Sequence, residues 1–103
     1  MADKQTNAPG ASALPVPSNQ CMQHAFRLSI TDDKPIMTDY WQTSHNKTSL
    51  IGVRANGDKM LVKNADEYTS PIDKIFKVEN EFIISTENSL YIVSATISSK
   101  RIT

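Results

Sequence analysis

From Cys21 onwards the chain is rich in β-branched residues, and this usage constrains the fold more than any other feature. The stretch holds ten isoleucines, four valines and eight threonines against four leucines and four alanines. Side chains branched at Cβ lose rotamer freedom in helices and pack well on pleated sheets. No segment shows the pattern of an amphipathic helix of three turns. We therefore expect an all-β domain.

Alternation of apolar and polar residues predicts where the first strands lie. A half-buried strand is expected over residues 22–30. Its inward face would carry Met22, His24, Phe26, Leu28 and Ile30. A turn follows at 32–35, because aspartate favours turns and Pro35 cannot donate to a ladder. A second strand is expected over residues 36–42.

The pair Asn56-Gly57 predicts a hairpin with a two-residue loop, whose central residues both need positive φ. In the expected register Ala55 faces Asp58. The strands then pair Val53 with Met60 and Ile51 with Val62.

A second hairpin is predicted around residues 87–88, with Thr86 opposite Ser89. The strands on either side then pair Ile84 with Tyr91, Ile83 with Ile92 and Phe82 with Val93. A three-residue loop at 79–81 is expected to join strand 75–78 to this hairpin. That loop would put Phe76, Val78, Phe82 and Ile84 on one face. Three strands then form a meander.

Composition changes near residue 20. Residues 1–20 hold three of the five prolines, no aromatic residue, and only Asp3 and Lys4 as charges. Such a segment buries too little apolar surface to offset the entropy of ordering, so we expect a flexible tail at 1–20 and one domain at 21–103. Residues 13–17 could lie as a polyproline II segment. The predicted architecture is a small antiparallel meander that closes as an SH3-like barrel or a small sandwich.

Charge and hydropathy narrow the classes of function. Eleven basic and eleven acidic residues give a formal net charge of zero, without the basic stripe that phosphate backbones attract. Nucleic acid is therefore not an expected partner. No apolar run reaches the roughly 20 residues that a membrane-spanning helix needs, and no secretion signal is visible. The expectation is a cytoplasmic protein without membrane contact. The single cysteine, Cys21, cannot form an internal disulfide.

Catalytic and metal-binding patterns are sparse. Cys21 and His24 have the spacing of half a zinc site, but only His45 remains as a further soft ligand, so no metal site is expected. His45 could act as a base with Ser44 or Ser49 as nucleophile and Asp39 as orienting group, but no sequence motif brings these residues together. No glycine-rich phosphate loop occurs. We expect no enzymatic activity and no cofactor.

Two short motifs carry a resemblance. Residues 69–72 are Thr-Ser-Pro-Ile, and residues 86–91 are Thr-Glu-Asn-Ser-Leu-Tyr. Together they resemble a Thr-Ser-x-Ile/Val and Thr-x-Asn-Ser-x-Tyr pattern of short, mostly uncharacterised all-β proteins of bacteria and their phages. The resemblance covers residues 67–93. It implies a bacterial or phage context and no particular activity.

The same motifs hold the candidate ligand-binding residues. Their hydroxyls and amides could gather at one end of the sheet and bind a small polar or anionic ligand, with Tyr68 or Trp41 as a flat apolar contact. The polar candidates are Thr69, Ser70, Thr86, Asn88 and Ser89. Turn chemistry is the other interpretation, because threonine and serine close turns and asparagine tolerates positive φ.

Three functions are compatible with the sequence. The first is a non-enzymatic binding or interaction module that forms homo-oligomers, because a small meander exposes sheet edges. The second is a phage-borne sponge that sequesters a small nucleotide signal to counter host defence. The third is a virion or assembly component.

Overall fold

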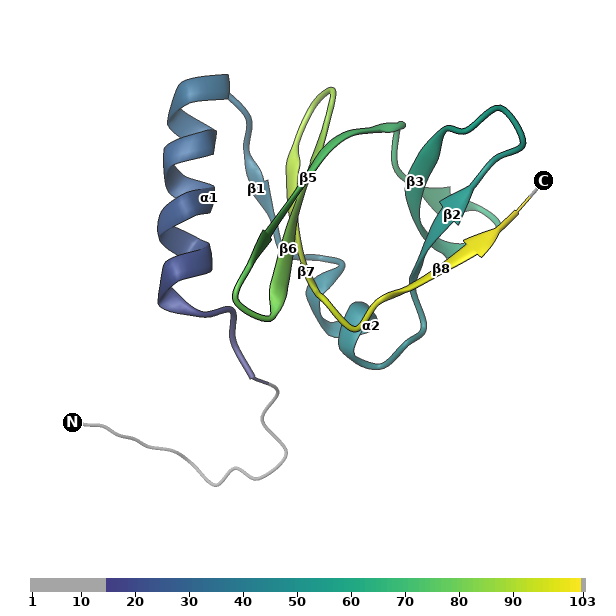
Figure 1. The fold of residues 1–103 in the computed structure, drawn as a ribbon, viewed down its shortest axis with the longest axis horizontal. Coiled ribbons are helices and arrows are strands. Elements are labelled where there is room, and N and C mark those ends of the chain that lie inside the picture. The colour runs from purple at the N-terminus through teal and green to yellow at the C-terminus, as the bar shows by residue number, and fades with distance from the viewer. Residues whose placement is uncertain (1–14, 103) are drawn as a thin grey trace.

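The computed structural model describes residues 15–102 (Figure 1). Helices and strands alternate irregularly along the chain. In chain order they are α1 (Asn19–Asp32), β1 (Ile36–Met37), α2 (Trp41–His45), β2 (Leu50–Val53), β3 (Lys59–Asn64), β4 (Glu67–Tyr68), β5 (Ile72–Val78), β6 (Glu81–Thr86), β7 (Leu90–Ser94) and β8 (Ser98–Arg101).

The strands form two four-stranded sheets. Sheet A has the order β1-β7-β6-β5 and sheet B the order β4-β3-β2-β8. Both sheets are mixed, because β1 pairs with β7 and β2 pairs with β8 in parallel while the other pairs are antiparallel. Helix α1 lies on one side of sheet A and sheet B lies on the other (Figure 1). The prediction of a small β-rich domain is confirmed. The all-β class and the closed SH3-like barrel are wrong, because α1 forms a layer of its own and the sheets remain open.

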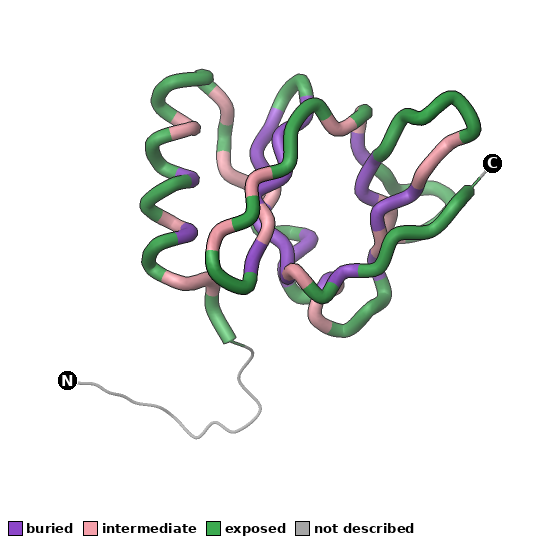
Figure 2. The backbone as a smooth tube through the Cα atoms, in the orientation of Figure 1, coloured by how far each residue is buried: buried purple, intermediate pink, exposed green. Residues whose placement is uncertain are grey.

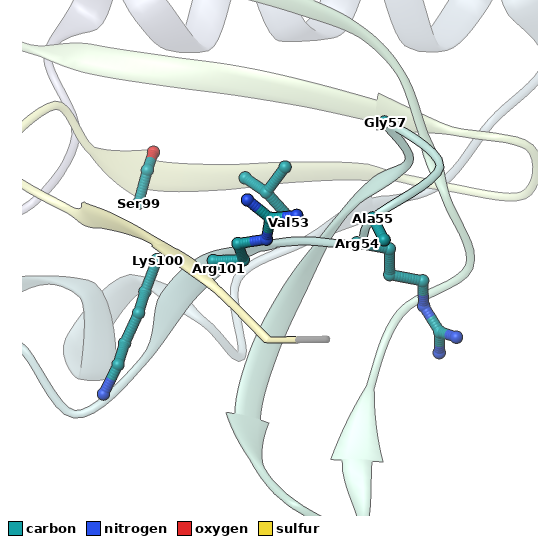
Figure 3. Close-up of a pocket in the computed structure, with 7 residues that line it drawn as sticks. All are labelled: Val53, Arg54, Ala55, Gly57, Ser99, Lys100 and Arg101. Carbon is teal, nitrogen blue, oxygen red and sulfur yellow. The ribbon is translucent and has the colours of Figure 1, made fainter.

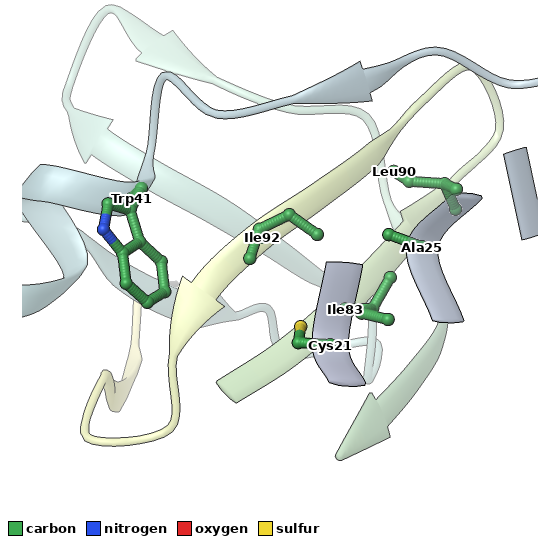
Figure 4. Packing of buried hydrophobic residues seen from close by; sticks show 6 residues of the cluster. All are labelled: Cys21, Ala25, Trp41, Ile83, Leu90 and Ile92. Atoms are coloured by element: carbon green, nitrogen blue, oxygen red, sulfur yellow. The ribbon is translucent and has the colours of Figure 1, made fainter. Parts of the chain in front are cut away.

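Strands β6 and β7 are buried on both faces (Figure 2). One face meets α1 in a helix-side core made of Cys21, Ala25, Trp41, Ile83, Leu90 and Ile92 (Figure 4). The other face meets sheet B in an inter-sheet core made of Tyr40, Ile51, Leu61, Ile84, Val93 and Ile97. Successive strand residues point to opposite faces, so each of these strands needs consecutive apolar residues. This requirement explains the pairs at 83–84 and 92–93.

The strand predicted over residues 22–30 is wrong, because this segment belongs to the 14-residue helix α1. Ser18 caps the helix by accepting a hydrogen bond from the Cys21 N–H at 3.1 Å. Asp33 ends it with φ 55°. The alternating residues 22, 26 and 30 are also four apart, so they form a helical stripe as readily as a strand face. That stripe is not the buried one, since Phe26 is 55% and Ile30 83% exposed.

The strand predicted over residues 36–42 is shorter than expected. Only Ile36 and Met37 form β1, which lies parallel to the start of β7. The chain then turns into the short helix α2 at Trp41. Ser44 anchors α2 to β7, because its Oγ accepts a hydrogen bond from the Ser94 N–H at 2.9 Å.

The β6–β7 hairpin has the predicted register throughout. Thr86 N–H donates to the Ser89 carbonyl at 2.9 Å, and the strands pair Ile84 with Tyr91, Ile83 with Ile92 and Phe82 with Val93. The β5-β6-β7 meander is likewise confirmed. The turn between Thr86 and Ser89 is consistent with the register of β6 and β7 that the sequence predicts.

Two other registers differ from the prediction by one residue. In the β5–β6 hairpin Val78 pairs with Glu81, so the loop is Glu79-Asn80, with Glu79 at φ 56°. Phe76 therefore faces α1, while Phe82 and Ile84 face sheet B. A one-residue shift moves every side chain to the other face.

In the β2–β3 hairpin Arg54 N–H bonds to the Asp58 carbonyl at 2.8 Å and Gly57 N–H to the Arg54 carbonyl at 2.9 Å. The loop thus has three residues, 55–57, and only Gly57 has positive φ. The observed pairs are Leu50 with Val62, Ile51 with Leu61, Gly52 with Met60 and Val53 with Lys59.

The predicted tail at 1–20 overlaps the described part of the chain at residues 15–20. The Trp41 indole N–H donates to the Pro15 carbonyl at 2.7 Å. Ser18 Oγ donates to Glu81 Oε1 at 2.8 Å. These contacts hold residues 15–18 against α2 and the β5–β6 hairpin. Residues 1–14, including the first two residues of the predicted polyproline segment at 13–17, lie outside the described residues.

Gly57 offers a test of the β2–β3 turn. Its φ is 95°, and an added Cβ would meet no atom within 4 Å, so the cost of a substitution reports backbone strain alone. We expect Gly57→Val to lower the free energy of unfolding by about 1 kcal/mol or more, and Gly57→Asn by less. Urea unfolding of both variants measures this. A wild-type midpoint for Gly57→Val would contradict the turn.

Candidate functional site

The hydroxyl of Thr86 is occupied inside the β6–β7 turn. Thr86 is 1% exposed, and its Oγ1 accepts hydrogen bonds from the N–H groups of Asn88 (3.4 Å) and Ser89 (3.2 Å). The same hydroxyl donates to the Ser89 carbonyl at 3.3 Å. Asn88 does not have the positive φ that the turn interpretation expected. The turn therefore depends on Thr86 and not on the conformational tolerance of Asn88.

Thr69 is occupied in a similar way between β4 and β5. Its Oγ1 accepts from the Leu61 N–H at 3.0 Å and donates to the Ser70 carbonyl at 2.9 Å. The motif at 69–72 does come near the turn at 86–89, since Ile72 pairs with Thr86. The hollow at this end of sheet A is lined by other residues, which are Lys34, Pro71, Ile72, Asp73 and Glu87. Lys34 Nζ donates to Ser85 Oγ at 3.0 Å and to the Thr86 carbonyl at 2.6 Å.

The two aromatic candidates lie in different environments. Trp41 is 8% exposed in the helix-side core and stacks edge-on against His45, with ring centroids 4.4 Å apart. Tyr68 is 54% exposed on β4, in sheet B. The structure therefore does not bring Trp41 to a surface with the polar candidates, whereas Tyr68 is accessible.

The nucleophile hypothesis finds little geometric support. Ser44 Oγ donates to the Trp41 carbonyl at 2.6 Å, and Asp39 forms an ion pair with Lys63 at 3.5 Å. His45 Nε2 and Ser49 Oγ are buried without a hydrogen-bond partner among the described residues. No group of three metal-ligating side chains occurs within residues 15–102. His24, expected on the inward face of a strand, is exposed on α1.

The outer face of sheet B carries a groove that the sequence did not reveal. The side chains of a strand point alternately to its two faces, and those of Ile51 and Leu61 point into the inter-sheet core. Met60 and Val62 therefore point to the opposite face of sheet B, where Gly52 lies beside Met60. Met60 and Val62 form the floor of a hollow of about 320 Å³. Tyr68, Arg54, Ile102 and the 64–65 turn line its walls. We call this hollow the sheet B groove.

Two packing details shape the groove. Ile102 lies over Gly52, because a Cβ at Gly52 would come within 2.7 Å of Ile102 Cδ1. Met60 is only 3% exposed although no other layer of residues 15–102 covers this face. Arg54 Nε is buried and has no hydrogen-bond partner among the described residues. The groove thus combines an apolar floor with one cationic wall.

A second hollow lies at the end of β2 and β8 (Figure 3). Its lining includes the cationic residues Arg54, Lys100 and Arg101. The ends of the Arg54 and Lys100 side chains lie far apart, so the charges do not converge on one point (Figure 3). They form a basic rim beside the sheet B groove.

Comparisons with known proteins give no match: no family model, no curated protein and no solved structure matches the chain. Among the described residues, neither helix has the length and apolarity to cross a bilayer.

Thr86 offers a test of the turn. Replacing it by valine keeps its shape, removes one donor, and leaves the N–H groups of the exposed Asn88 and the buried Ser89 without their acceptor. We expect Thr86→Val to lower the free energy of unfolding by roughly 1–3 kcal/mol. Asn88→Ala is the matched control, and we expect it to change stability by less than about 0.5 kcal/mol. Equal effects of the two variants in urea unfolding would show that Thr86 does not organise the turn.

Two buried groups predict alkaline destabilisation. Burial, and secondly the Glu81 carboxylate, raise the pKa of Cys21 to about 11 from its ordinary value of 9.0. Burial, and secondly Asp39, raise the pKa of Tyr40 to about 12 from 10.0. Above each ordinary value the unfolded chain releases a proton that the folded chain retains, so stability falls as pH rises.

The expected loss begins near pH 9 for Cys21 and near pH 10 for Tyr40. Cys21→Ala should flatten the stability profile between pH 9 and 10, and Tyr40→Phe should flatten only the part above. Denaturant unfolding across this range measures both. Rapid reaction of native Cys21 with a thiol reagent at pH 8 would be inconsistent with a buried, protonated thiol.

Proposed function

We propose that this protein is a non-catalytic interaction module that binds a segment of a partner protein in the sheet B groove. The observation that carries the proposal is an apolar groove on a sheet face that no other layer of the described residues covers. Tyr68, 54% exposed, stands at its edge beside the buried Met60. Exposed aromatic side chains next to buried apolar floors are typical of residues that dominate binding energy in protein interfaces.

The walls of the groove indicate the chemistry of the partner. Met60 and Val62 offer apolar contact for one inserted side chain. Arg54 lines the same groove, and Lys100 shares the outer face because it pairs with Gly52. These cations favour a carboxylate next to the apolar side chain. The proposed occupant is therefore a peptide segment with a large apolar residue beside Asp or Glu.

The openness of the groove favours a chain segment over a small ligand. Tyr68 is 54% and Ile102 38% exposed, so these two walls of the groove remain accessible to solvent. Small-molecule sites usually bury about 70–90% of the ligand, and walls this exposed favour an occupant that needs less enclosure. A protein segment needs less enclosure, because its remaining contacts lie on the surrounding surface.

The other expectations from the sequence remain part of the proposal. A bacterial or phage context and assembly into homo-oligomers both agree with an interaction module. The alternative function, a protein that sequesters a nucleotide signal, is supported by the basic rim of Arg54, Lys100 and Arg101, because phosphate groups bind such residues. The experiment below therefore includes cyclic nucleotides as competitors.

The test selects ligands from a phage-displayed library of random linear peptides. We expect the enriched peptides to carry an apolar residue next to Asp or Glu. A synthetic peptide of the consensus sequence should shift the backbone amide resonances of Met60, Val62 and Tyr68 in NMR titrations. Tyr68→Ala should weaken its binding at least tenfold, which is about 1.4 kcal/mol.

Phe26→Ala is the matched control, because Phe26 is an aromatic residue of α1 with nearly the same exposure, 55% against 54% for Tyr68. It should bind the peptide as wild type does. Equal affinity of the Tyr68 variant and wild type, or amide shifts confined to another surface, would overturn the proposal. Displacement of the peptide by a cyclic nucleotide would favour the sponge.

A further inference from the structure

Gly52, within β2, lies directly beneath the side chain of Ile102. A Cβ atom added at Gly52 would stand 2.7 Å from Ile102 Cδ1 and 3.1 Å from Ile102 Cγ2. Carbon atoms that are not bonded pack at larger separations, so a side chain at position 52 would force Ile102 to move. Gly52 does not have the positive φ that favours glycine, in contrast to Gly57. Its role is therefore to leave room for a close neighbour, as glycines within strands often do.

The backbone of the neighbouring strand fixes the position of Ile102. Ile102 follows β8, which pairs in parallel with β2, and its N–H donates to the Val53 carbonyl at 3.0 Å. Val62 on β3 borders the same space, since its Cγ2 would lie 3.0 Å from a Cβ added at Gly52. Ile102 thus covers the β2 side of the groove floor, next to Val62. A side chain inserted beside Val62 would therefore meet Ile102 and not the backbone of β2.

We propose that Ile102 determines how large an apolar side chain the sheet B groove accepts. The inference rests on the proposed function and deepens it, because it names the residue that selects the partner's apolar side chain. On the β2 side the groove ends at Ile102. Without the carbons beyond its Cβ, the groove would extend to the bare backbone at Gly52, and a larger side chain would gain buried apolar area there. A difference of one methylene group in an apolar pocket changes affinity by about 10–200-fold, so selection of this kind is measurable.

Support for β8 is the other interpretation of this contact. The four residues of β8 are all exposed, so Ile102 helps to hold the strand against β2. A purely structural role of this kind predicts that Ile102→Ala lowers stability without changing which side chain the groove prefers. Ile102 lines the groove as well as covering Gly52, and this position favours the role in selection.

Two synthetic peptides test the inference on the full chain. Both carry the consensus sequence of the selected library peptides, with leucine at the apolar position in one and tryptophan in the other. Ile102→Ala should raise the ratio of the affinity for the tryptophan peptide to that for the leucine peptide by about tenfold or more. In the double variant Gly52→Ala/Ile102→Ala the added methyl group refills part of the space above β2, so the ratio should return towards the wild-type value. Ile102→Val, which removes only Cδ1, should raise the ratio by less than Ile102→Ala.

Ile75→Ala is the matched control, because Ile75 is an isoleucine of β5 in sheet A with nearly the same exposure, 40% against 38% for Ile102. It should leave the ratio as in wild type. Circular dichroism and the melting temperature show whether each variant folds, and Ile102→Val replaces Ile102→Ala as the decisive variant if the alanine variant does not. An unchanged ratio in the folded Ile102 variant would overturn the proposal, as would an equal rise in Ile75→Ala.

A probe that is not a peptide separates this inference from the proposed function. Free indole at millimolar concentration should shift the amide resonance of Gly52 more in Ile102→Ala than in wild type, because apolar hollows that a truncation opens bind small apolar molecules. The double variant should resemble wild type. If no peptide binds the groove, the proposed function fails, and the indole titration still decides whether Ile102 closes the space above Gly52. Equal indole shifts in Ile102→Ala and wild type would overturn the inference even if the consensus peptide binds.

Discussion

Burial of the β6–β7 hairpin on both faces is the constraint on which the rest of the structure depends. Ile83 and Ile92 need a cover on one side of sheet A, and Ile84 and Val93 need a cover on the other. Each side chain of this kind contributes roughly 1.5–3 kcal/mol when it leaves water. Helix α1 supplies the first cover and sheet B the second. A barrel closed by one sheet would bury only one face of each strand.

This arrangement also determines which surfaces remain available for binding. Sheet B covers sheet A with one face. In the part of the chain that the structure describes, no further layer lies on its other face, which carries Met60 and Tyr68. Sheet A ends at β5, whose outer side faces no strand formed by residues 15–102. The groove and the open edge are therefore consequences of the layering. They lie on different sheets.

The sequence predicts those structural features that depend on residues close together in the chain. Thr86 and Ser89 close their turn within four residues, and the register of β6 and β7 follows from it. The sequence does not predict helix α1, because its alternating apolar residues fit the period of a strand as well as that of a helix. Its two buried residues, Cys21 and Ala25, are small and do not stand out as core residues in the sequence. The groove could not be predicted, since Ile102 reaches Gly52 only through the parallel pairing of β8 with β2. Tyr68 was singled out for its aromatic ring, but with a different set of neighbours.

The most direct test of the account is a NOESY spectrum of the methyl-labelled protein. Ile83 and Ile84 are consecutive residues of β6 in different cores. The account predicts cross-peaks from Ile83 to the methyl group of Ala25 in α1. It predicts cross-peaks from Ile84 to Leu61 in sheet B. Cross-peaks from both isoleucines to the same element, or strand-type backbone cross-peaks for residues 19–32, would contradict it.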